Sequence, residues 1–225
     1  MTALATLFDF NGVLVDDEHV HLAAFRDVVE PLGMKLTEEA YVERYMGFDD
    51  RGAFTAMLAD AGHTVSADRV RSLVRAKKPA YMARIKDGLK VFPGAVELVR
   101  HRATLGVVGI VSGALEHEIR YCLERMGVAE QIAFIIPADA TKESKPDPEG
   151  YLLGREALRA RGSMDGIAVA IEDSLAGVAA AKAAGLRCIA VAHAYDAAAL
   201  RGAGADAVAA TIADVTDAML DGTAA

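Results

Sequence analysis

Short, unbroken apolar runs recur along most of the chain and predict the buried strands of a sheet. The runs lack polar alternation, which is typical of parallel strands that are covered on both faces. We expect strands at residues 4–10, 107–111, 132–136, 167–171 and 188–192, with a weaker candidate at 206–210.

Helical patterns lie between these runs from about residue 92 onward. Pro93 is expected at the first position of one helix, and Gly127 and Gly185 are expected just after the ends of two others. The alternation predicts right-handed crossovers and a doubly wound parallel sheet, so the fold class is α/β and Rossmann-like. The expected helices cover residues 93–103, 115–126, a segment opened by Asp147-Pro148-Glu149, and 175–184; the tail, 197–225, is expected to hold helix and strand.

The segment from residue 15 to residue 87 interrupts this alternation, because it carries helical patterns and no clear strand. Phe25, Val28, Val29 and Leu32 recur at helical spacing and predict one apolar face. Further helices are expected after Thr37, as an N-cap, over residues 49–61 and over 67–84, where Pro79 should kink or end the helix. We therefore expect a core of residues 1–14 and 88–225 with an inserted α-helical cap of residues 15–87.

Composition and charge narrow the function. The 225 residues include 24 Lys and Arg against 32 Asp and Glu, a net charge of −8. This balance argues against a nucleic-acid partner or an anionic membrane surface. Cys122 and Cys188 are expected to be reduced and buried. The N-terminal segment has no basic region, and no apolar run approaches a membrane span, so we expect a cytoplasmic protein, as a monomer or weak dimer.

Polar motifs follow four of the expected strands. They are Asp9-Phe10-Asn11-Gly12, Ser112-Gly113, Lys145-Pro146 and Glu172-Asp173. In open parallel sheets ligands bind at the carboxyl ends of the strands, so these side chains should converge. A carboxylate can attack phosphorus, while a hydroxyl, a backbone N–H and an ammonium can hold a phosphoryl group. The several acidic oxygens favour Mg²⁺.

The ordered set of motifs resembles the haloacid dehalogenase superfamily. It comprises Asp9-x-x-Gly-Val, Ser112, Lys145-Pro-Asp-Pro and the long match from Glu172-Asp173-Ser174 to Gly185. The helical insert after the first motif is similar to that of the subgroup of β-phosphoglucomutase and related sugar-phosphate phosphatases. The resemblance covers essentially the whole chain.

This resemblance implies a role for each motif. Asp9 would be the nucleophile and a Mg²⁺ ligand, Asn11 would offer its backbone carbonyl to the metal, and Asp173 would be a ligand with Glu172 ligating or orienting. Ser112, the backbone N–H of Gly113 and Lys145 would bind the phosphoryl group. In the cap, His21, Arg51 in the turn 47–51, and Lys77 or Lys78 match positions that face the substrate in this subgroup.

Asn11 departs from the family pattern, in which phosphatases and mutases usually carry a second Asp as general acid and base. An amide side chain cannot transfer that proton, a function worth about 10² to 10⁴ in rate. Three explanations stay open: Asp17 replaces the lost carboxylate, the substrate has a good leaving group, or the protein binds a phosphorylated ligand and turns it over poorly.

These observations favour one function. We expect a Mg²⁺-dependent phosphohydrolase that acts on a small phosphorylated metabolite, a sugar phosphate being the favoured class, through an aspartyl-phosphate. A sugar phosphomutase is the alternative within enzymes, although it depends more heavily on the missing acid. A catalytically impaired phospho-ligand-binding protein is the alternative from another class.

Overall fold

A parallel sheet forms the centre of the fold, in a computed structural model that describes residues 5–163 and 168–223. Within these residues the sheet has six strands in the order β3-β2-β1-β4-β5-β6, and every neighbouring pair is parallel. The strands are β1 (Thr6–Phe8), β2 (Val108–Val111), β3 (Phe134–Ile136), β4 (Val169–Glu172), β5 (Arg187–Val191) and β6 (Ala207–Ala209).

The burial of the strands confirms the α/β prediction. Every residue of β1, β2 and β4 is buried, as is all of β5 after Arg187. The strands β3 and β6 lie at the sheet edges and are only partly buried, which explains why 206–210 gave the weaker pattern. The expected strand starts at Leu4 and Ile167 lie outside the described residues.

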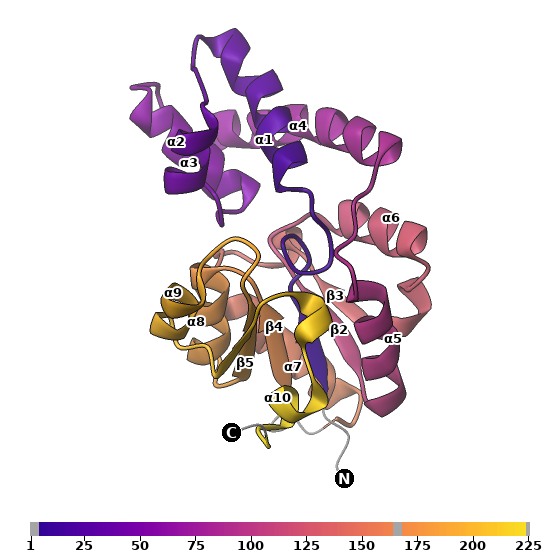
Figure 1. Ribbon diagram of the computed structural model, residues 1–225. Coiled ribbons are helices and arrows are strands. Elements are labelled where there is room, and N and C mark those ends of the chain that lie inside the picture. Colours follow the sequence, from indigo (N-terminus) through magenta and orange to yellow (C-terminus); the bar gives the residue numbers. More distant parts are fainter. Residues whose placement is uncertain (1–4, 164–167, 224–225) are drawn as a thin grey trace. The chain divides into compact units, whose positions relative to one another are not determined.

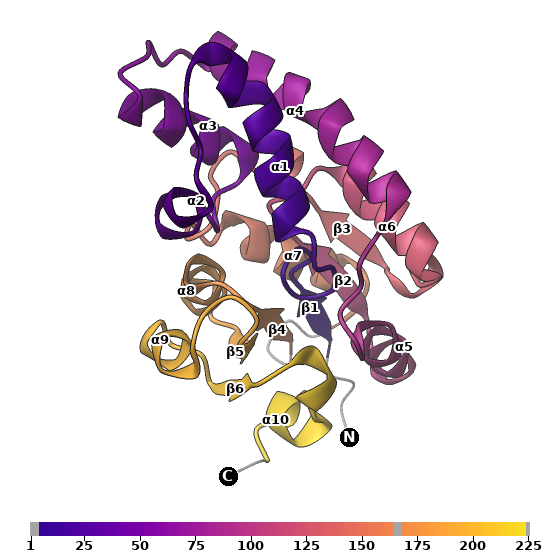
Figure 2. The ribbon, with the colours of Figure 1, turned by 45° about the horizontal axis from the view of Figure 1, so that its top comes forward.

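Helices cover both faces of the sheet (Figures 1 and 2). On one face, α7, α8 and α9 pack against a core that includes Leu7, Tyr151, Val178 and Leu200. The helices α5 and α10 lie on the other face. The helices of this unit are α5 (Ala95–Leu105), α6 (Glu116–Met126), α7 (Glu149–Ala160), α8 (Leu175–Ala183), α9 (Ala197–Gly202) and α10 (Asp217–Asp221).

The two helix starts that were predicted from proline are wrong by one or two residues. Pro93 precedes α5, because Gly94 takes the N-cap position in the left-handed conformation and the helix begins at Ala95. Pro148 is the N-cap of α7, not its first residue, although the Asp147 carboxylate still accepts the N–H of Glu149 at 2.9 Å. Gly127 and Gly185, by contrast, end their helices with positive φ as predicted.

Gly94→Ala is expected to lower the free energy of unfolding by about 2–4 kcal/mol, the sum of left-handed strain and overpacking. Gly94 has φ +88°, and an added Cβ would lie 2.7 Å from Ala213 Cα, which is backbone and cannot rotate away. Denaturant unfolding measures the change. Gly162→Ala is the matched control, because Gly162 has φ +74° and open space around it, and should lose only the conformational part.

The chain divides into two compact units: the inserted segment, Asp17–Lys90, is a helical unit, and the other unit comprises Met1–Asp16 and Val91–Ala225. The sequence placed these boundaries at 14/15 and 87/88. The helical unit has its own apolar core, which includes Phe25, Phe54 and Leu58. Its helices are α1 (Glu18–Val29), α2 (Glu38–Arg44), α3 (Asp50–Asp60) and α4 (Ala67–Asp87).

Local chemistry accounts for most of these helices. Thr37 caps α2 as predicted, since its hydroxyl accepts the N–H of Ala40. Leu32 departs from the predicted apolar face, because α1 ends at Val29 and a 3₁₀ turn follows. Pro79 does not end α4, which continues to Asp87. Buried Tyr81 and Ile85 beyond the proline show that packing outweighs the one backbone hydrogen bond that proline removes.

None of the helices in the described part of the chain combines the length and the apolar composition that crossing a bilayer requires.

Candidate active site

The first motif lies where β1 ends. Asp9 is buried, and its backbone N–H donates to Ile171 O of the neighbouring strand at 2.9 Å, which fixes the residue beside the end of β4. The chain then turns sharply at Gly12, which has φ +73°. A Cβ at Gly12 would lie 2.1 Å from Asp173 Oδ2, so glycine is required both by the backbone and by the closeness of that carboxylate.

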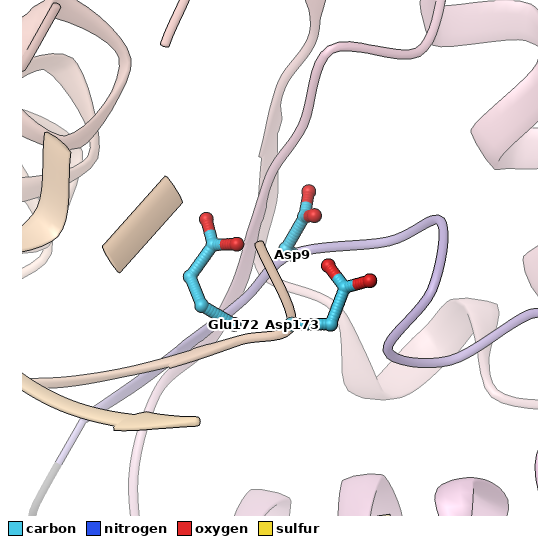
Figure 3. A group of neighbouring side chains, drawn as sticks. All are labelled: Asp9, Glu172 and Asp173. Atoms are coloured by element: carbon cyan, nitrogen blue, oxygen red, sulfur yellow. The ribbon is translucent and has the colours of Figure 1, made fainter. Parts of the chain in front are cut away.

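Glu172 and Asp173 end the neighbouring strand. Glu172 is the last residue of β4, and both carboxylates are buried. Carboxylate oxygens of Asp9, Glu172 and Asp173 all lie within 4.8 Å of one another. Figure 3 shows these three side chains gathered from two adjacent strand ends. The convergence that the sequence predicted for these acidic residues is therefore present in the structure.

Lys145 joins this acidic group from the loop between β3 and α7. Its ammonium lies 2.9 Å from Asp9 Oδ1 and 2.6 Å from Glu172 Oε1, and it also donates to Val111 O at 3.2 Å. Residues from the ends of β1, β2 and β4 thus all contact one lysine. Such an ammonium, held rigidly beside a potential nucleophile, can bind an anionic oxygen of a substrate.

Tyr151 is a member of this group that the sequence analysis missed. It lies in the first turns of α7, fully buried, and its hydroxyl donates to Glu172 Oε1 at 2.6 Å. Burial and the neighbouring Glu172 carboxylate raise the pKa of Tyr151 well above its usual value, so the hydroxyl keeps its proton as a donor. A tyrosine on the apolar face of a helix is usually a core residue, and no local sequence pattern distinguishes Tyr151 from such a residue.

Burial and charge act in opposite directions on the central ion pair. Burial raises the pKa of Glu172 to about 7, although Lys145 favours the charged carboxylate. Burial also lowers the pKa of Lys145, but the carboxylates of Asp9 and Glu172 outweigh this effect and leave it raised. Lys145 is therefore positively charged, and Glu172 needs further positive charge nearby to be fully ionised at neutral pH.

Ser112 and Gly113 follow β2 at the same edge of the sheet. The Ser112 hydroxyl accepts the N–H of Ala114 at 3.1 Å and lies 3.5 Å from Asn11 Oδ1. Gly113 is exposed, so its backbone is open to a ligand. A hydroxyl and a backbone amide beside the first motif are the kind of donors that phosphoryl oxygens require.

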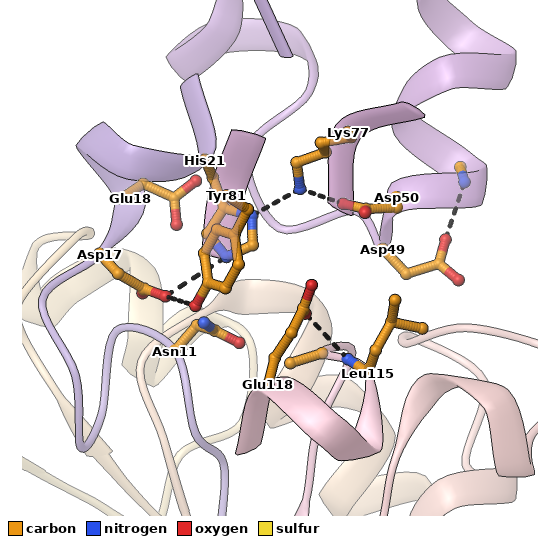
Figure 4. A network of polar contacts seen from close by, with 12 residues as sticks. Asn11, Asp17, Glu18, His21, Asp49, Asp50, Lys77, Tyr81, Leu115 and Glu118 are labelled. Carbon is orange, nitrogen blue, oxygen red and sulfur yellow. Dashed lines mark hydrogen bonds and ion pairs between the residues drawn. The ribbon is translucent and has the colours of Figure 1, made fainter. Parts of the chain in front are cut away.

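The remaining predicted site residues belong to the helical unit, where they form a network of their own (Figure 4). Asp17 accepts the Tyr81 hydroxyl at 2.5 Å and lies 3.4 Å from His21 Nε2. Lys77 contacts His21 Nδ1 at 2.7 Å and forms an ion pair with Asp50. Burial and Lys77 lower the pKa of His21, but Asp17 and Glu18 outweigh them and raise it.

Two further cap positions differ in their surroundings. Arg51 lies 3.1 Å from Asp49, whose carboxylate caps α3 by accepting the N–H of Gly52. Lys78, in contrast to buried Lys77, is exposed on α4. The sequence left open which lysine has a role; in the structure Lys77 is the one built into the polar network.

The acidic group fits a divalent cation. Oε2 of Glu172 is buried and has no hydrogen-bond partner, an arrangement that is costly without a positive group nearby. When ionised, Asp9, Glu172 and Asp173 carry three negative charges against the single charge of Lys145. Carboxylate oxygens at this spacing are the donor set that Mg²⁺ prefers, so these three residues are the candidates to hold it.

Several known proteins that are similar to this chain are named as hydrolases or phosphatases. Residues 6–191 match the haloacid dehalogenase-like hydrolase family. A phosphorylated carbohydrates phosphatase from Thermotoga maritima is 31% identical over 188 residues, 82% of this chain and 83% of that protein. The chain therefore belongs to the haloacid dehalogenase-like hydrolase family.

Solved structures share the fold of this chain. CbbY from Rhodobacter sphaeroides, in complex with phosphate, aligns with a TM-score of 0.81 and 27% identity, covering 98% of this chain and 100% of that one. β-Phosphoglucomutase from Clostridium difficile shares the fold, with a TM-score of 0.84 at 20% identity, over 96% of this chain and 94% of that one. These comparisons support the haloacid dehalogenase-like hydrolase that the motifs predicted, and the β-phosphoglucomutase structure shows a shared fold.

Proposed function

We propose that the protein is a Mg²⁺-dependent phosphohydrolase that acts on a small phosphorylated metabolite, with a sugar phosphate as the favoured class. The observation that carries the proposal is the contact of Lys145 with both Asp9 and Glu172, beside the Asp9, Glu172 and Asp173 carboxylates. A phosphorylated carbohydrate is the substrate class named for the Thermotoga maritima relative. The phosphate complex of CbbY supports a phosphoryl-binding site in this fold.

In the proposed mechanism Asp9 is the nucleophile. One of its carboxylate oxygens attacks phosphorus, the bond to the leaving oxygen breaks, and an aspartyl-phosphate forms. Lys145, the Ser112 hydroxyl and the N–H of Gly113 hold the phosphoryl oxygens and stabilise the charge that develops on them. Water then attacks the phosphorus of the aspartyl-phosphate and releases phosphate, which regenerates Asp9.

Charge balance explains the role of a metal in this proposal. A phosphate monoester brings about −1.5 to −2 charge to a site that already holds three carboxylates. Bound by Asp9, Asp173, Glu172 and the backbone carbonyl of Asn11, Mg²⁺ would neutralise part of this charge and orient the phosphoryl group. Asp173 and Glu172 thereby act as ligands, and Lys145 supplies the remaining positive charge.

The proton for the leaving group is the open step. In this chain the Asn11 amide stands where a second carboxylate would serve, and Asn11 Oδ1 lies 3.5 Å from the Ser112 hydroxyl. Because an amide cannot protonate the leaving oxygen, substrates with good leaving groups should be the fastest. The same observation supports the second candidate function, a phospho-ligand binder with poor turnover, which would keep the metal and phosphoryl contacts. Asp17 stays a predicted replacement acid.

Mg²⁺ at about 100 times its dissociation constant is expected to stabilise the protein by about 2.7 kcal/mol and to be required for phosphate release. Asp173→Asn should abolish both effects, because it removes a ligand oxygen charge from the acidic group. The measurements are thermal unfolding with Mg²⁺ or a chelator, and phosphate release from a panel of sugar and acyl phosphates.

Asp221→Asn is the matched control, since it makes the same substitution at an exposed position in α10. That variant should respond to Mg²⁺ as the unaltered protein does. If Asp173→Asn kept its full stabilisation by Mg²⁺, the assignment of the metal to this site would be wrong, whatever the activity. Mg²⁺ binding without phosphate release from any compound would instead favour the binder.

A further inference from the structure

His193 follows β5 and contacts the loop that carries the proposed nucleophile, although the sequence indicated no role for it. Its Nδ1 lies 2.7 Å from Gly12 O. Its Nε2 lies 3.3 Å from the backbone N of Ile212. Since a carbonyl only accepts and an N–H only donates, Nδ1 must carry the proton and Nε2 must be the acceptor. Both bonds therefore require the neutral Nδ1–H form of the ring.

The same ring also packs on the segment that returns from the helical unit. His193 stacks on Phe92, with ring centroids 3.9 Å apart and an angle of 19° between the planes. Phe92 in turn donates its N–H to Leu14 O at 3.1 Å, and Val91 pairs with Val15. The His193 side chain thus contacts both of the segments that connect the two units, residues 12–15 and residues 91–92.

Gly12 is the point at which this contact can affect chemistry. Its left-handed turn sets the path between Asn11 and Val13, and its N–H donates to Val15 O at 2.9 Å. Its Cα lies against the Asp173 carboxylate, so closely that a Cβ could not be accommodated. A shift of the Gly12 peptide would therefore disturb both the loop of Asp9 and Asn11 and the neighbouring Asp173.

We propose that His193 is a positioning residue, which holds the Gly12 carbonyl through Nδ1–H and so fixes the nucleophile loop against the end of β4. The proposal builds on the proposed phosphohydrolase function but makes a claim about loop order that is measurable without turnover. Residues that orient a metal or catalytic group typically change affinity or activity about 10–100-fold when they are removed.

Three substitutions separate the contacts of His193. His193→Phe keeps an aromatic ring for stacking on Phe92 and removes both hydrogen bonds. His193→Asn places an amide N–H near the position of Nδ1 and can still donate to Gly12 O. His193→Gln places its amide near the position of Nε2, where it can meet only Ile212. The Asn and Gln variants are thus a matched pair that differs in the proposed contact.

Hydrogen exchange of the amides in residues 9–15 is the first readout, with thermal unfolding as the measure of overall stability. In His193→Phe and His193→Gln the amides of this segment should exchange about tenfold faster than in the unaltered protein. This is the effect of losing one hydrogen bond between neutral groups, worth about 1.4 kcal/mol. His193→Asn should stay within about threefold. The value of kcat should follow the same order, with a fall of about tenfold in the Phe and Gln variants.

Two results would overturn the proposal. One is unchanged exchange in His193→Phe, which would show that the Gly12 bond does not order the loop. The other is equal impairment of the Asn and Gln variants, which would indicate general damage to the fold. Exchange is measured without substrate, so failure of the phosphatase assignment would leave this result intact, and failure of the positioning role would leave phosphate release in the unaltered protein unchanged.

Discussion

The Asn11→Asp variant is expected to hydrolyse sugar phosphates about 10² to 10⁴ times faster than the protein with Asn11, the usual worth of general acid–base catalysis. The residue follows the proposed nucleophile by two positions, and its side chain already lies at the edge of the sheet near Ser112. A carboxyl group there can protonate the leaving oxygen and later take a proton from water. Phosphate release under saturating Mg²⁺ measures the change.

The gain should depend on the leaving group. The leaving group of an acyl phosphate is a carboxylate, which needs no proton. Asn11→Asp should therefore accelerate the hydrolysis of acyl phosphates far less than that of sugar phosphates. Asn11→Ala should bring no gain with either substrate, since it supplies no acid. Because Asn-Gly sequences can deamidate, the mass of the peptide that contains Asn11 must be checked in each preparation, so that traces of Asp at this position do not mimic turnover.

A different outcome would assign the acid elsewhere. If the protein with Asn11 already hydrolysed sugar phosphates as fast as Asn11→Asp, the missing carboxylate would have a substitute. Asp17 is the named candidate, and Asp17→Asn would then abolish the activity. The structure shows Asp17 bonded to Tyr81 within the helical unit, so Tyr81→Phe serves as a control for loss of that contact alone.

Asp9→Asn is expected to lower phosphate release by at least about 10³-fold with every substrate, because the amide is too weak a nucleophile to attack phosphorus. The loss should be as large in the Asn11→Asp background as in the unaltered protein, since the acid cannot act without an attacking group. The measurement is phosphate release over long incubations, with Asp221→Asn as the matched substitution that keeps activity.

The fold should survive the Asp9→Asn substitution. Lys145 keeps its contacts with Glu172 at 2.6 Å and with Val111 O at 3.2 Å when the Asp9 charge is removed. Circular dichroism and thermal unfolding should therefore show a folded protein. A folded Asp9→Asn protein that still released phosphate at the original rate would contradict the assignment of Asp9 as nucleophile.

The strands and the converging motifs could be predicted because both leave local signals. A strand buried on both faces must be apolar throughout, as β1, β2 and β4 are, and a ligand edge must carry polar residues directly after them. Helix ends were less predictable. The helix α5 begins at Ala95 because Gly94 takes a left-handed N-cap conformation, and no local pattern reveals the close approach of Gly94 to Ala213, more than a hundred residues later in the chain.

The residues that the sequence missed are those whose roles arise only from tertiary contacts. Tyr151 reaches Glu172 from a helix, and His193 reaches Gly12 from a loop on the far side of β4. Tyr151 lies inside a helix and follows no strand, and although His193 comes soon after β5, no local pattern shows that it contacts Gly12. The sequence also could not show which of Lys77 and Lys78 belongs to the polar network. In the structure Lys77 contacts Asp50 and His21, whereas Lys78 is exposed.

Detection of an aspartyl-phosphate is the sharpest test of the proposed phosphoryl transfer to Asp9. The protein with Asn11 should be mixed with an acyl phosphate and Mg²⁺, quenched in acid, digested and examined by mass spectrometry. Because Asn11 cannot activate water, the intermediate should accumulate, and a phosphoryl group should be found on Asp9 and lost in Asp9→Asn. Phosphate release without any phosphoryl group on Asp9, or with one on another residue, would show that Asp9 is not the nucleophile.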